Sequence, residues 1–343
     1  MITVTPLTSH LSSWQKDFAE AITDPAELAN MLGLTADWVK EARAASAIFP
    51  LRVPRSYIAR MRSGDMNDPL LRQVLPVGAE LAEIAGYSAD PLNESAALVA
   101  PRLLQKYRNR ALLVTTGACA VHCRYCFRRT FDYESAQSDL GRWQEAIAAL
   151  AADSEISELI LSGGDPLSLS NTRLKSLTNS LKTVPHLKML RIHTRQPIVL
   201  PSRVDSGLIA WLDSLPWRVT VVLHVNHPQE LQGDVLKAIE ELRQSGALLL
   251  NQSVLLAGIN DNPTVLAKLA RLLHQLGVLP YYLHLLDPVK GTSHFAVSAS
   301  RGIEIIDALA RDLPGFLVPR LAQEIPGEDA KLVVAAGLNR LPI

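Results

Sequence analysis

The chain has few of the features that mark secreted, membrane-bound or nucleic-acid-binding proteins. Its 343 residues include only three cysteines, and 34 Lys plus Arg balance 34 Asp plus Glu, so the formal net charge is zero. A neutral chain disfavours a nucleic-acid or membrane-surface partner. No apolar run reaches the roughly 18 residues that a membrane helix needs. The opening residues, MITVTP, show no basic stretch followed by an apolar one, so no secretory signal is expected.

Because cysteine is scarce, its placement is informative. Cys119, Cys123 and Cys126 have the spacing C-x3-C-x2-C, and the chain contains no other cysteine. Three thiolates on one short loop can bind three irons of a [4Fe-4S] cluster, whereas clusters that only transfer electrons usually have four cysteines. The fourth iron is then open, as metal sites that perform chemistry require. Free thiols and such a cluster both favour a cytoplasmic location.

The cysteine spacing allows two other interpretations. A disulfide framework is disfavoured, because the cysteine count is odd and no secretion signal precedes the chain. Structural zinc is the stronger alternative, since His122 could serve as a fourth ligand. However, His122 and Cys123 are adjacent, whereas zinc sites usually draw their ligands from two separated pairs. A zinc-binding structural module therefore stays an alternative, which iron and sulfide analysis of anaerobically purified protein would test.

Apolar, β-branched runs alternate with helix-like stretches from residue 111 onward. This alternation predicts a parallel sheet covered by helices. Residues 1–105 instead look helical with proline breaks, and we expect them to pack against the sheet. The predicted divisions are an N-terminal helical region (1–105), a central α/β region (106–315) and a C-terminal segment (316–343). The predicted strands are 111–116, 158–162, 189–193, 219–225, 247–254 and 281–286, and the predicted helices are 142–152, 172–183, 206–215, 230–245, 263–276 and 300–312.

Polar residues follow each predicted strand. The carboxyl ends of parallel barrel strands form the active-site face, so these residues are expected to meet in one site. They are the cysteine loop, Ser162-Gly163-Gly164-Asp165, His193-Thr194-Arg195, His224-Val225-Asn226-His227, Asn251-Gln252-Ser253 and Asp287.

The cysteine loop, with Tyr125 and Phe127 beside its last cysteine, resembles that of the radical S-adenosylmethionine (SAM) superfamily. The resemblance implies a partial (β/α)6 barrel, and an open iron that binds the amino and carboxylate groups of SAM before a 5′-deoxyadenosyl radical is formed. The glycine pair after the second strand fits this picture, because glycine lets the backbone approach a ligand and Asp165 can accept from an ammonium group. The residues then expected to bind SAM are Ser162, Gly163, Gly164, Asp165, His224 and Asn226.

A narrower resemblance covers residues 54–331. The segments KYRNRALL, CRYCFRR, LSGGDPL, HVNHP, NQSVLL and PYYLHLLD are similar to those of the lysine 2,3-aminomutase family. These enzymes add pyridoxal phosphate (PLP) to radical chemistry and move an amino group between C2 and C3 of an amino acid. The resemblance implies that Lys331 holds PLP as a Schiff base, although the preceding turn, IPGEDA, has fewer glycines than is usual. The other residues it assigns to PLP are Lys106, Tyr107, Arg110, Asn251 and Gln252, with Lys106 standing where arginine is usual.

The same resemblance assigns the substrate contacts. Arg128 matches the arginine that binds the substrate carboxylate, for which a bidentate guanidinium is suited, and Arg129 is the alternative. Asp287 and Glu324 match two acidic positions that bind the ε-ammonium group of lysine, with Glu324 standing where aspartate is usual. A buried carboxylate facing another carboxylate is costly, so these acids favour L-lysine over glutamate.

The absence of further cysteines narrows the resemblance. Larger family members carry additional cysteines that bind zinc between subunits, and this chain has Asn262 at the first of those positions. Short members without them supply (R)-β-lysine for elongation factor P, which implies that the product passes to an enzyme that lysylates this factor. The expected electron donor is a flavodoxin or a ferredoxin. The main alternative is a radical SAM enzyme that lacks PLP.

Overall fold

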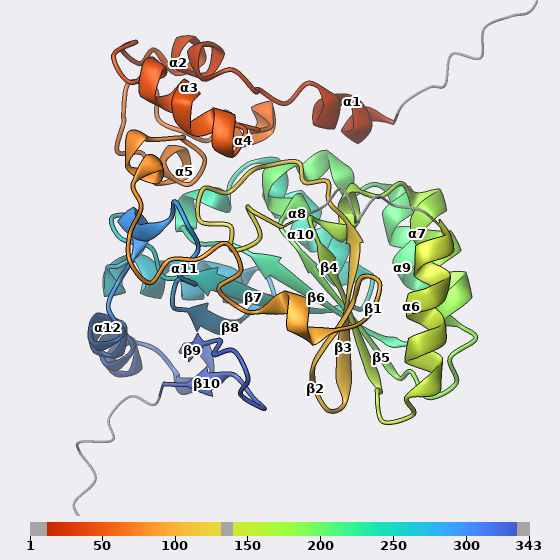
Figure 1. Cartoon of the computed structure of the whole chain (residues 1–343). Coiled ribbons are helices and arrows are strands. Elements are labelled where there is room, and N and C mark those ends of the chain that lie inside the picture. The colour runs from red at the N-terminus through yellow and green to blue at the C-terminus, as the bar shows by residue number, and fades with distance from the viewer. Residues whose placement is uncertain (1–11, 132–139, 335–343) are drawn as a thin grey trace, which may run out of the picture.

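A single twisted sheet forms the centre of the molecule (Figure 1). The computed structural model describes residues 12–131 and 140–334, so residues 1–11 and 335–343 of the two predicted terminal regions lie outside the described residues. The ten strands of this sheet lie side by side in the order of the sequence. They are β1 (Leu98–Ala100), β2 (Leu103–Tyr107), β3 (Arg110–Thr116), β4 (Glu158–Gly163), β5 (Met189–Thr194), β6 (Arg218–His224), β7 (Leu248–Val254), β8 (Leu279–His284), β9 (Arg320–Gln323) and β10 (Leu332–Val333).

The predicted partial (β/α)6 barrel is confirmed. Strands β3 to β9 pair in parallel, and helices connect them across the outside of the sheet. The helices are α1 (Ser13–Ala19), α2 (Pro25–Leu32), α3 (Val39–Ile48), α4 (Arg55–Ile58), α5 (Pro69–Arg72), α6 (Leu140–Ala152), α7 (Asn171–Leu181), α8 (Gln196–Val199), α9 (Ser206–Asp213), α10 (Asp234–Gln244), α11 (Pro263–Gln275) and α12 (Ala299–Asp312).

Local sequence explains where the outer helices begin. The side chain of Asp205 accepts a hydrogen bond from the backbone of Leu208 at the start of α9, and Asn262 caps α11 in the same way, with Pro263 at its first position. Such caps satisfy backbone N–H groups that have no partner inside the helix. Every residue of β4 is buried, as expected for a strand covered by helices on its outer face. Together, these helix caps and buried strands define the repeated strand–helix unit of the barrel.

The two ends of the sheet differ from the sequence prediction. The sequence predicts a helical region over residues 1–105, but residues 98–107 form the β1–β2 hairpin, which extends the sheet antiparallel to β3. Arg102 has a φ of +67° in the turn, a conformation that is uncommon for a residue other than glycine. At the other end, β9 pairs in parallel with β8, and β10 turns back on β9. These short strands bring the C-terminal segment beside the barrel.

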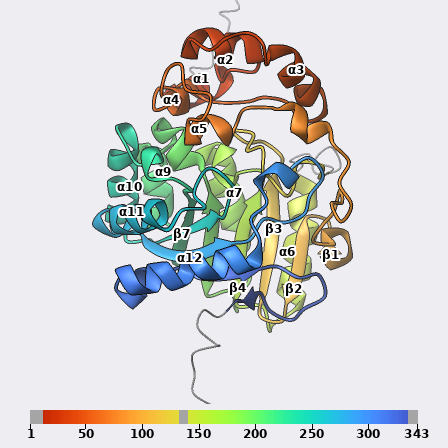
Figure 2. The same ribbon diagram turned by 90° about the vertical axis from the view of Figure 1, so that its left-hand side faces the viewer.

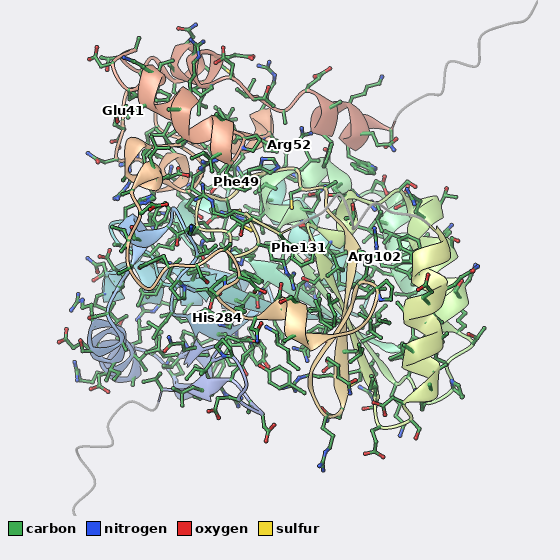
Figure 3. All side chains as sticks on the ribbon, viewed as in Figure 1. Glu41, Phe49, Arg52, Arg102, Phe131 and His284 are labelled. Carbon is green, nitrogen blue, oxygen red and sulfur yellow. The ribbon has the colours of Figure 1, made fainter. Side chains whose placement is uncertain are left out.

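Helices α1 to α5 lie over one end of the sheet, as both views show (Figures 1 and 2). They form their own apolar cluster, which also includes Ala120 and Val121 of the cysteine loop and Val199 and Leu200 after β5. Phe49 and Arg52 lie at the junction between these helices and the barrel (Figure 3). The N-terminal region therefore covers the face at which the parallel strands end. Among the described residues, no helix is long and apolar enough to span a bilayer.

Candidate active site

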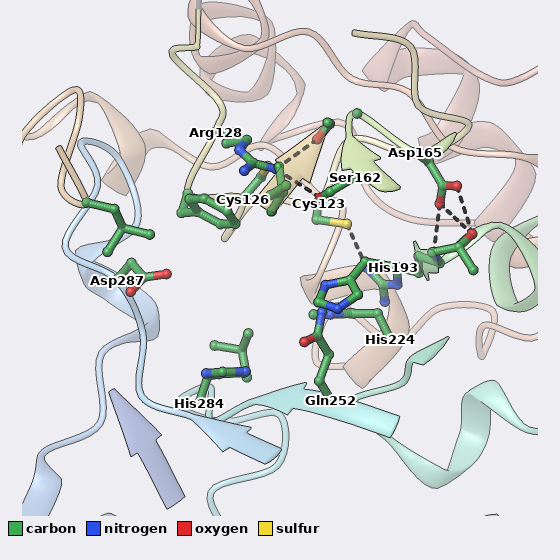
Figure 4. A pocket seen from close by; sticks show the side chains of 18 of the residues that line it. Cys123, Cys126, Arg128, Ser162, Asp165, His193, His224, Gln252, His284 and Asp287 are labelled. Carbon is green, nitrogen blue, oxygen red and sulfur yellow. Dashed lines mark hydrogen bonds between the residues drawn. The ribbon is translucent and has the colours of Figure 1, made fainter. Parts of the chain in front are cut away.

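A cavity of about 790 Å³ opens at the carboxyl ends of the parallel strands (Figure 4). The structure brings sixteen of the eighteen predicted site residues to its wall, and leaves out Asn226 and Asn251. The sixteen are Cys119, Cys123, Cys126, Lys106, Tyr107, Arg110, Gln252, Lys331, Ser162, Gly163, Gly164, Asp165, His224, Arg128, Asp287 and Glu324.

Backbone hydrogen bonds hold the cysteine loop against the N-terminal region. The amide of His122 donates to Arg52 O at 2.9 Å, and that of Arg124 donates to Gln73 O at 2.9 Å. Burial, together with the neighbouring Cys123, raises the pKa of Cys126 to about 11. The Cys126 thiol is therefore protonated without metal, and binding iron has to displace its proton. His122, the alternative zinc ligand, places Nδ1 2.8 Å from Pro50 O and stacks on Phe49.

The cysteine set fits a cluster better than a single ion. Among the described residues, no three His, Cys, Asp or Glu side chains converge closely enough to hold one metal ion. In a [4Fe-4S] cluster each cysteine binds a different iron, so the ligands stand farther apart than around one ion. Three thiols at the wall of a single cavity meet that requirement.

The two arginines after the last cysteine have different surroundings. Arg129 donates to Glu80 at 2.6 Å and to Gly291 O at 3.0 Å, while Arg124 also binds Glu80 through both its Nε and Nη2 atoms. This buried group ties the cysteine loop to the N-terminal region. Arg128 instead donates to Ser162 Oγ at 3.0 Å, beside the glycine pair. Arg128 is thus the better placed of the two for a ligand near the cluster loop.

Glu94 is a site residue that the sequence did not reveal. Its two carboxylate oxygens accept from Arg128 Nε and Nη2 at 2.7 and 2.8 Å, and it lies 3.8 Å from Lys106 Nζ. A bidentate pair of this kind fixes the plane of the guanidinium. Glu94 stands in a short 3-10 helix, Glu94–Ala97, in a region without a recognisable motif.

The glycine pair after β4 is required by close backbone packing. Gly163 has a φ of +122°, and a Cβ atom there would lie 2.6 Å from Thr116 O. A Cβ atom on Gly164 would lie 2.5 Å from Ala118 O. Both carbonyls belong to the stretch that leads into the cysteine loop. The glycines therefore set how closely the predicted SAM segment approaches the cluster ligands.

Asp165 is held by protein donors. Its carboxylate accepts from the Thr194 hydroxyl at 2.7 Å and from the backbone N–H groups of Arg195, Gln196 and Leu167 at 2.7, 3.0 and 3.0 Å. The expected role of Asp165 as an acceptor for an ammonium group stays a prediction. The hydrogen bonds of Asp165 organise the loop after β5. Asp165 lies in the cavity wall, as predicted.

The two predicted asparagines hold the framework behind the cavity. Asn226 donates to the Tyr125 hydroxyl at 2.7 Å, and the amide of Val225 donates to Asn251 Oδ1 at 2.9 Å. Both asparagines are buried. His224 does line the cavity, where it stacks on Tyr125 with Nε2 3.0 Å from the hydroxyl. Neither asparagine lies at the cavity wall in this structure, and their assignment to SAM and PLP stays a prediction.

The far side of the cavity holds acids and lysines. Glu324 pairs with Lys331 Nζ and lies 3.3 Å from Lys106 Nζ. Burial favours its neutral form, but the two lysines prevail and lower the pKa of Glu324 to about 2. Asp287 lies apart in Figure 4 and its carboxylate has no hydrogen-bond or ion-pair partner among the described residues. Burial and the charge of Glu324 raise the pKa of Asp287 to about 7.

The residues assigned to PLP fit such a group. Lys106 and Lys331 are the two lysines of the described cavity wall. Arg110, a candidate phosphate ligand, lies over the Tyr107 ring at 4.2 Å from its centroid and faces the same space. His193 Nε2 is buried at the cavity wall without a hydrogen-bond partner. A polar ligand or a water molecule in the cavity would satisfy this atom.

Comparisons with known proteins identify the relatives of this chain. Residues 109–193 match the family described as a 4Fe-4S single cluster domain. The chain is 45% identical over 329 residues to L-lysine 2,3-aminomutase of Escherichia coli (strain K12), with 96% of each chain covered. It is 33% identical to the protein of that name from Clostridium subterminale, over 94% of this chain and 78% of the relative.

A solved structure, a radical SAM methyltransferase from Sphaerobacter thermophilus, aligns with a TM-score of 0.44 and 19% identity, over 64% of this chain and 68% of that one. L-lysine 2,3-aminomutase of Haemophilus influenzae is 42% identical to this chain. The alignment covers 96% of this chain and 98% of the relative. Because relatives at 40 to 45% identity align over nearly the entire chain, it belongs to the lysine 2,3-aminomutase family.

Proposed function

We propose that this chain isomerises L-lysine to β-lysine by moving the amino group from C2 to C3, with a [4Fe-4S] cluster, SAM and PLP as cofactors. The observation that carries the proposal is the unpaired, buried carboxylate of Asp287, which lines the same cavity as the three cysteines and Arg128. When bound, the cluster and SAM supply the radical that takes a hydrogen atom, and PLP supports migration of the nitrogen. Names of the relatives support lysine as the substrate.

The charges of the cavity suit a zwitterion with a cationic tail. Arg128 provides a guanidinium for the carboxylate, and Asp287 provides a carboxylate for the ε-ammonium group. Glu324 already pairs with two lysines of the protein. Asp287 therefore contributes more than Glu324 to the preference for lysine over other amino acids. An unpaired charge in a closed site of low dielectric constant costs several kcal/mol, which disfavours glutamate and neutral amino acids.

Replacing Asp287 with asparagine is expected to lower kcat/KM for lysine by about a hundredfold to several thousandfold, since removing one partner of a buried ion pair costs about 3–5 kcal/mol. Cleavage of SAM without lysine should change much less, because Asp287 lies away from the cysteine loop. Both rates are measured anaerobically on reconstituted protein by product analysis. Glu328→Gln removes an exposed acid of the same C-terminal segment and serves as the matched control. Full lysine turnover by the Asp287→Asn protein would remove Asp287 from the substrate site.

Lysine binding is expected to weaken as the pH falls below about 7. The pKa of Asp287 is raised to about 7, so the carboxyl is mostly neutral at pH 6 and mostly ionised at pH 8. The ammonium group of lysine favours the ionised form, and its affinity should therefore decline by about tenfold per pH unit below that pKa. Equilibrium binding measurements between pH 5.5 and 8 test this. Norleucine, whose side chain is neutral, provides the comparison, and parallel pH profiles for the two amino acids would contradict the assignment.

We further propose that flavodoxin or ferredoxin reduces the cluster, and that the product passes to the enzyme that lysylates elongation factor P. The support is the resemblance to short family members, together with coverage of 96% of both chains in the first relative. Supplying the reaction product to that ligation enzyme and measuring the mass of elongation factor P tests the second step. An unmodified factor, with synthetic (R)-β-lysine accepted in parallel, would exclude this fate.

A further inference from the structure

Arg195 reaches the cluster loop from the adjoining β5 connection. It follows β5 directly and precedes α8, and the residue is 6% exposed. Its Nη1 atom lies 2.8 Å from Cys123 Sγ, the contact drawn from that sulfur in Figure 4. Neither the resemblance nor the proposed lysine contacts assign a role to this residue.

The guanidinium is held in place by three further groups. Its Nη2 atom donates to Gln73 Oε1 at 2.6 Å, to Glu230 Oε2 at 2.9 Å and to the Tyr57 hydroxyl at 3.1 Å. Glu230 is fully buried, and its other oxygen accepts from the amides of Asn226 and His227 at 2.9 and 3.0 Å. The positive group therefore cannot turn away from the sulfur without breaking several buried hydrogen bonds.

We propose that Arg195 is a positioning residue that sets the reduction potential of the [4Fe-4S] cluster through Cys123, with Glu230 as its counter-charge. The inference rests on the cluster in the proposed function, and on nothing assigned to PLP or lysine. Hydrogen bonds to cluster sulfurs and nearby charge tune the potential of such centres. Because reduction adds one negative charge, a buried cation at the sulfur stabilises the reduced form, and a buried anion behind it opposes that effect.

Two substitutions should therefore move the potential in opposite directions. Arg195→Gln removes the cation and is expected to lower the midpoint potential, so that reduction is disfavoured by at least tenfold, which equals about 59 mV for one electron. Glu230→Gln removes the counter-charge and is expected to raise it. The midpoint is measured by electron paramagnetic resonance in an anaerobic redox titration of reconstituted protein, without PLP or lysine.

A matched control separates this effect from general loss of a buried arginine. Arg203 is also fully buried, but it donates to Leu167 O at 2.6 Å and to Leu169 O at 3.1 Å, behind the cavity. Arg203→Gln should leave the midpoint potential unchanged. Shifts of the same sign in the Arg195→Gln and Glu230→Gln proteins would overturn the proposal, because a purely structural disturbance has no reason to depend on the sign of the charge removed.

Cluster loading is measured alongside by iron and sulfide content. If the Arg195→Gln protein fails to load a cluster, the midpoint potentials of the Glu230→Gln and Arg195→Lys proteins test the proposal instead. Lysine keeps the charge but loses the fork that reaches both the sulfur and Glu230, so a smaller negative shift is expected. An unchanged potential in both proteins would overturn the role of Arg195. A wild-type protein without any cluster would instead overturn the proposed function.

Discussion

A Cys126→Ala protein is expected to lose the [4Fe-4S] cluster and, with it, all cleavage of SAM. The chain contains three cysteines, and all of them lie on this loop, so no other thiolate can replace the missing ligand. The same result is expected for Cys119→Ala and Cys123→Ala. The measurement combines iron and sulfide analysis with detection of 5′-deoxyadenosine after anaerobic reconstitution.

The control for this experiment is His122→Gln. His122 neighbours Cys123 but contacts Pro50 and Phe49, so a cluster needs only the three thiolates and should load normally in this variant. A zinc module would show the reverse pattern, with zinc in the wild-type protein and weaker metal binding after loss of His122. A Cys→Ala protein that keeps a SAM-responsive cluster would exclude the assignment of the loop.

Lys331→Ala should abolish lysine isomerisation and stable PLP binding, while slow cleavage of SAM without lysine persists. Borohydride reduction of the wild-type protein, followed by peptide mapping, is expected to find the pyridoxyl group on Lys331. The structure supplies one clear competitor, because Lys106 is the other lysine in the described cavity wall. Both lysines contact Glu324, so the mapping decides between two amino groups in one small region.

Lys106→Gln provides the comparison for that experiment. If Lys106 holds a phosphate through its charge, this variant binds PLP more weakly but still carries the pyridoxyl group on Lys331. If the wild-type protein carries the pyridoxyl label on Lys106, then Lys106 and not Lys331 forms the Schiff base with PLP. No label on either lysine would support a radical SAM enzyme that lacks PLP.

The repeated strand and helix units were predictable because their sequence signal is strong. The predicted strand 219–225 corresponds to β6 at 218–224, and the predicted helix 263–276 corresponds to α11 at 263–275. Long, nearly continuous apolar runs identify buried parallel strands. The β1–β2 hairpin has no such run, since its pairing depends on β3 and on the unusual turn at Arg102. Its strands are stabilised by tertiary contacts more than by local preference.

The candidate site was predictable to the level of which strand ends contribute, but less so for the direction of each side chain. Successive residues of a strand point to opposite faces, so Asn251 and Gln252 do not both line one cavity. Gln252 does, and Asn251 is buried behind it. Glu94 and Arg195 show a second limit, because their partners lie 34 and 72 residues away in the chain. The Glu94 contact exists only once the N-terminal region and the barrel have come together, and the Arg195 contact only once the loops after β3 and β5 have come together.

The unpaired carboxylate of Asp287 has a consequence for the lifetime of the protein. A carboxyl whose pKa rises from 3.8 to about 7 on folding favours the unfolded chain at neutral pH, by about 4 kcal/mol. That penalty is absent at low pH and grows as the pH rises through this range. A bound ammonium group removes it. If lysine binds as proposed, the amount of folded protein in a cell would follow the supply of its own substrate, since unliganded molecules unfold and are degraded more readily.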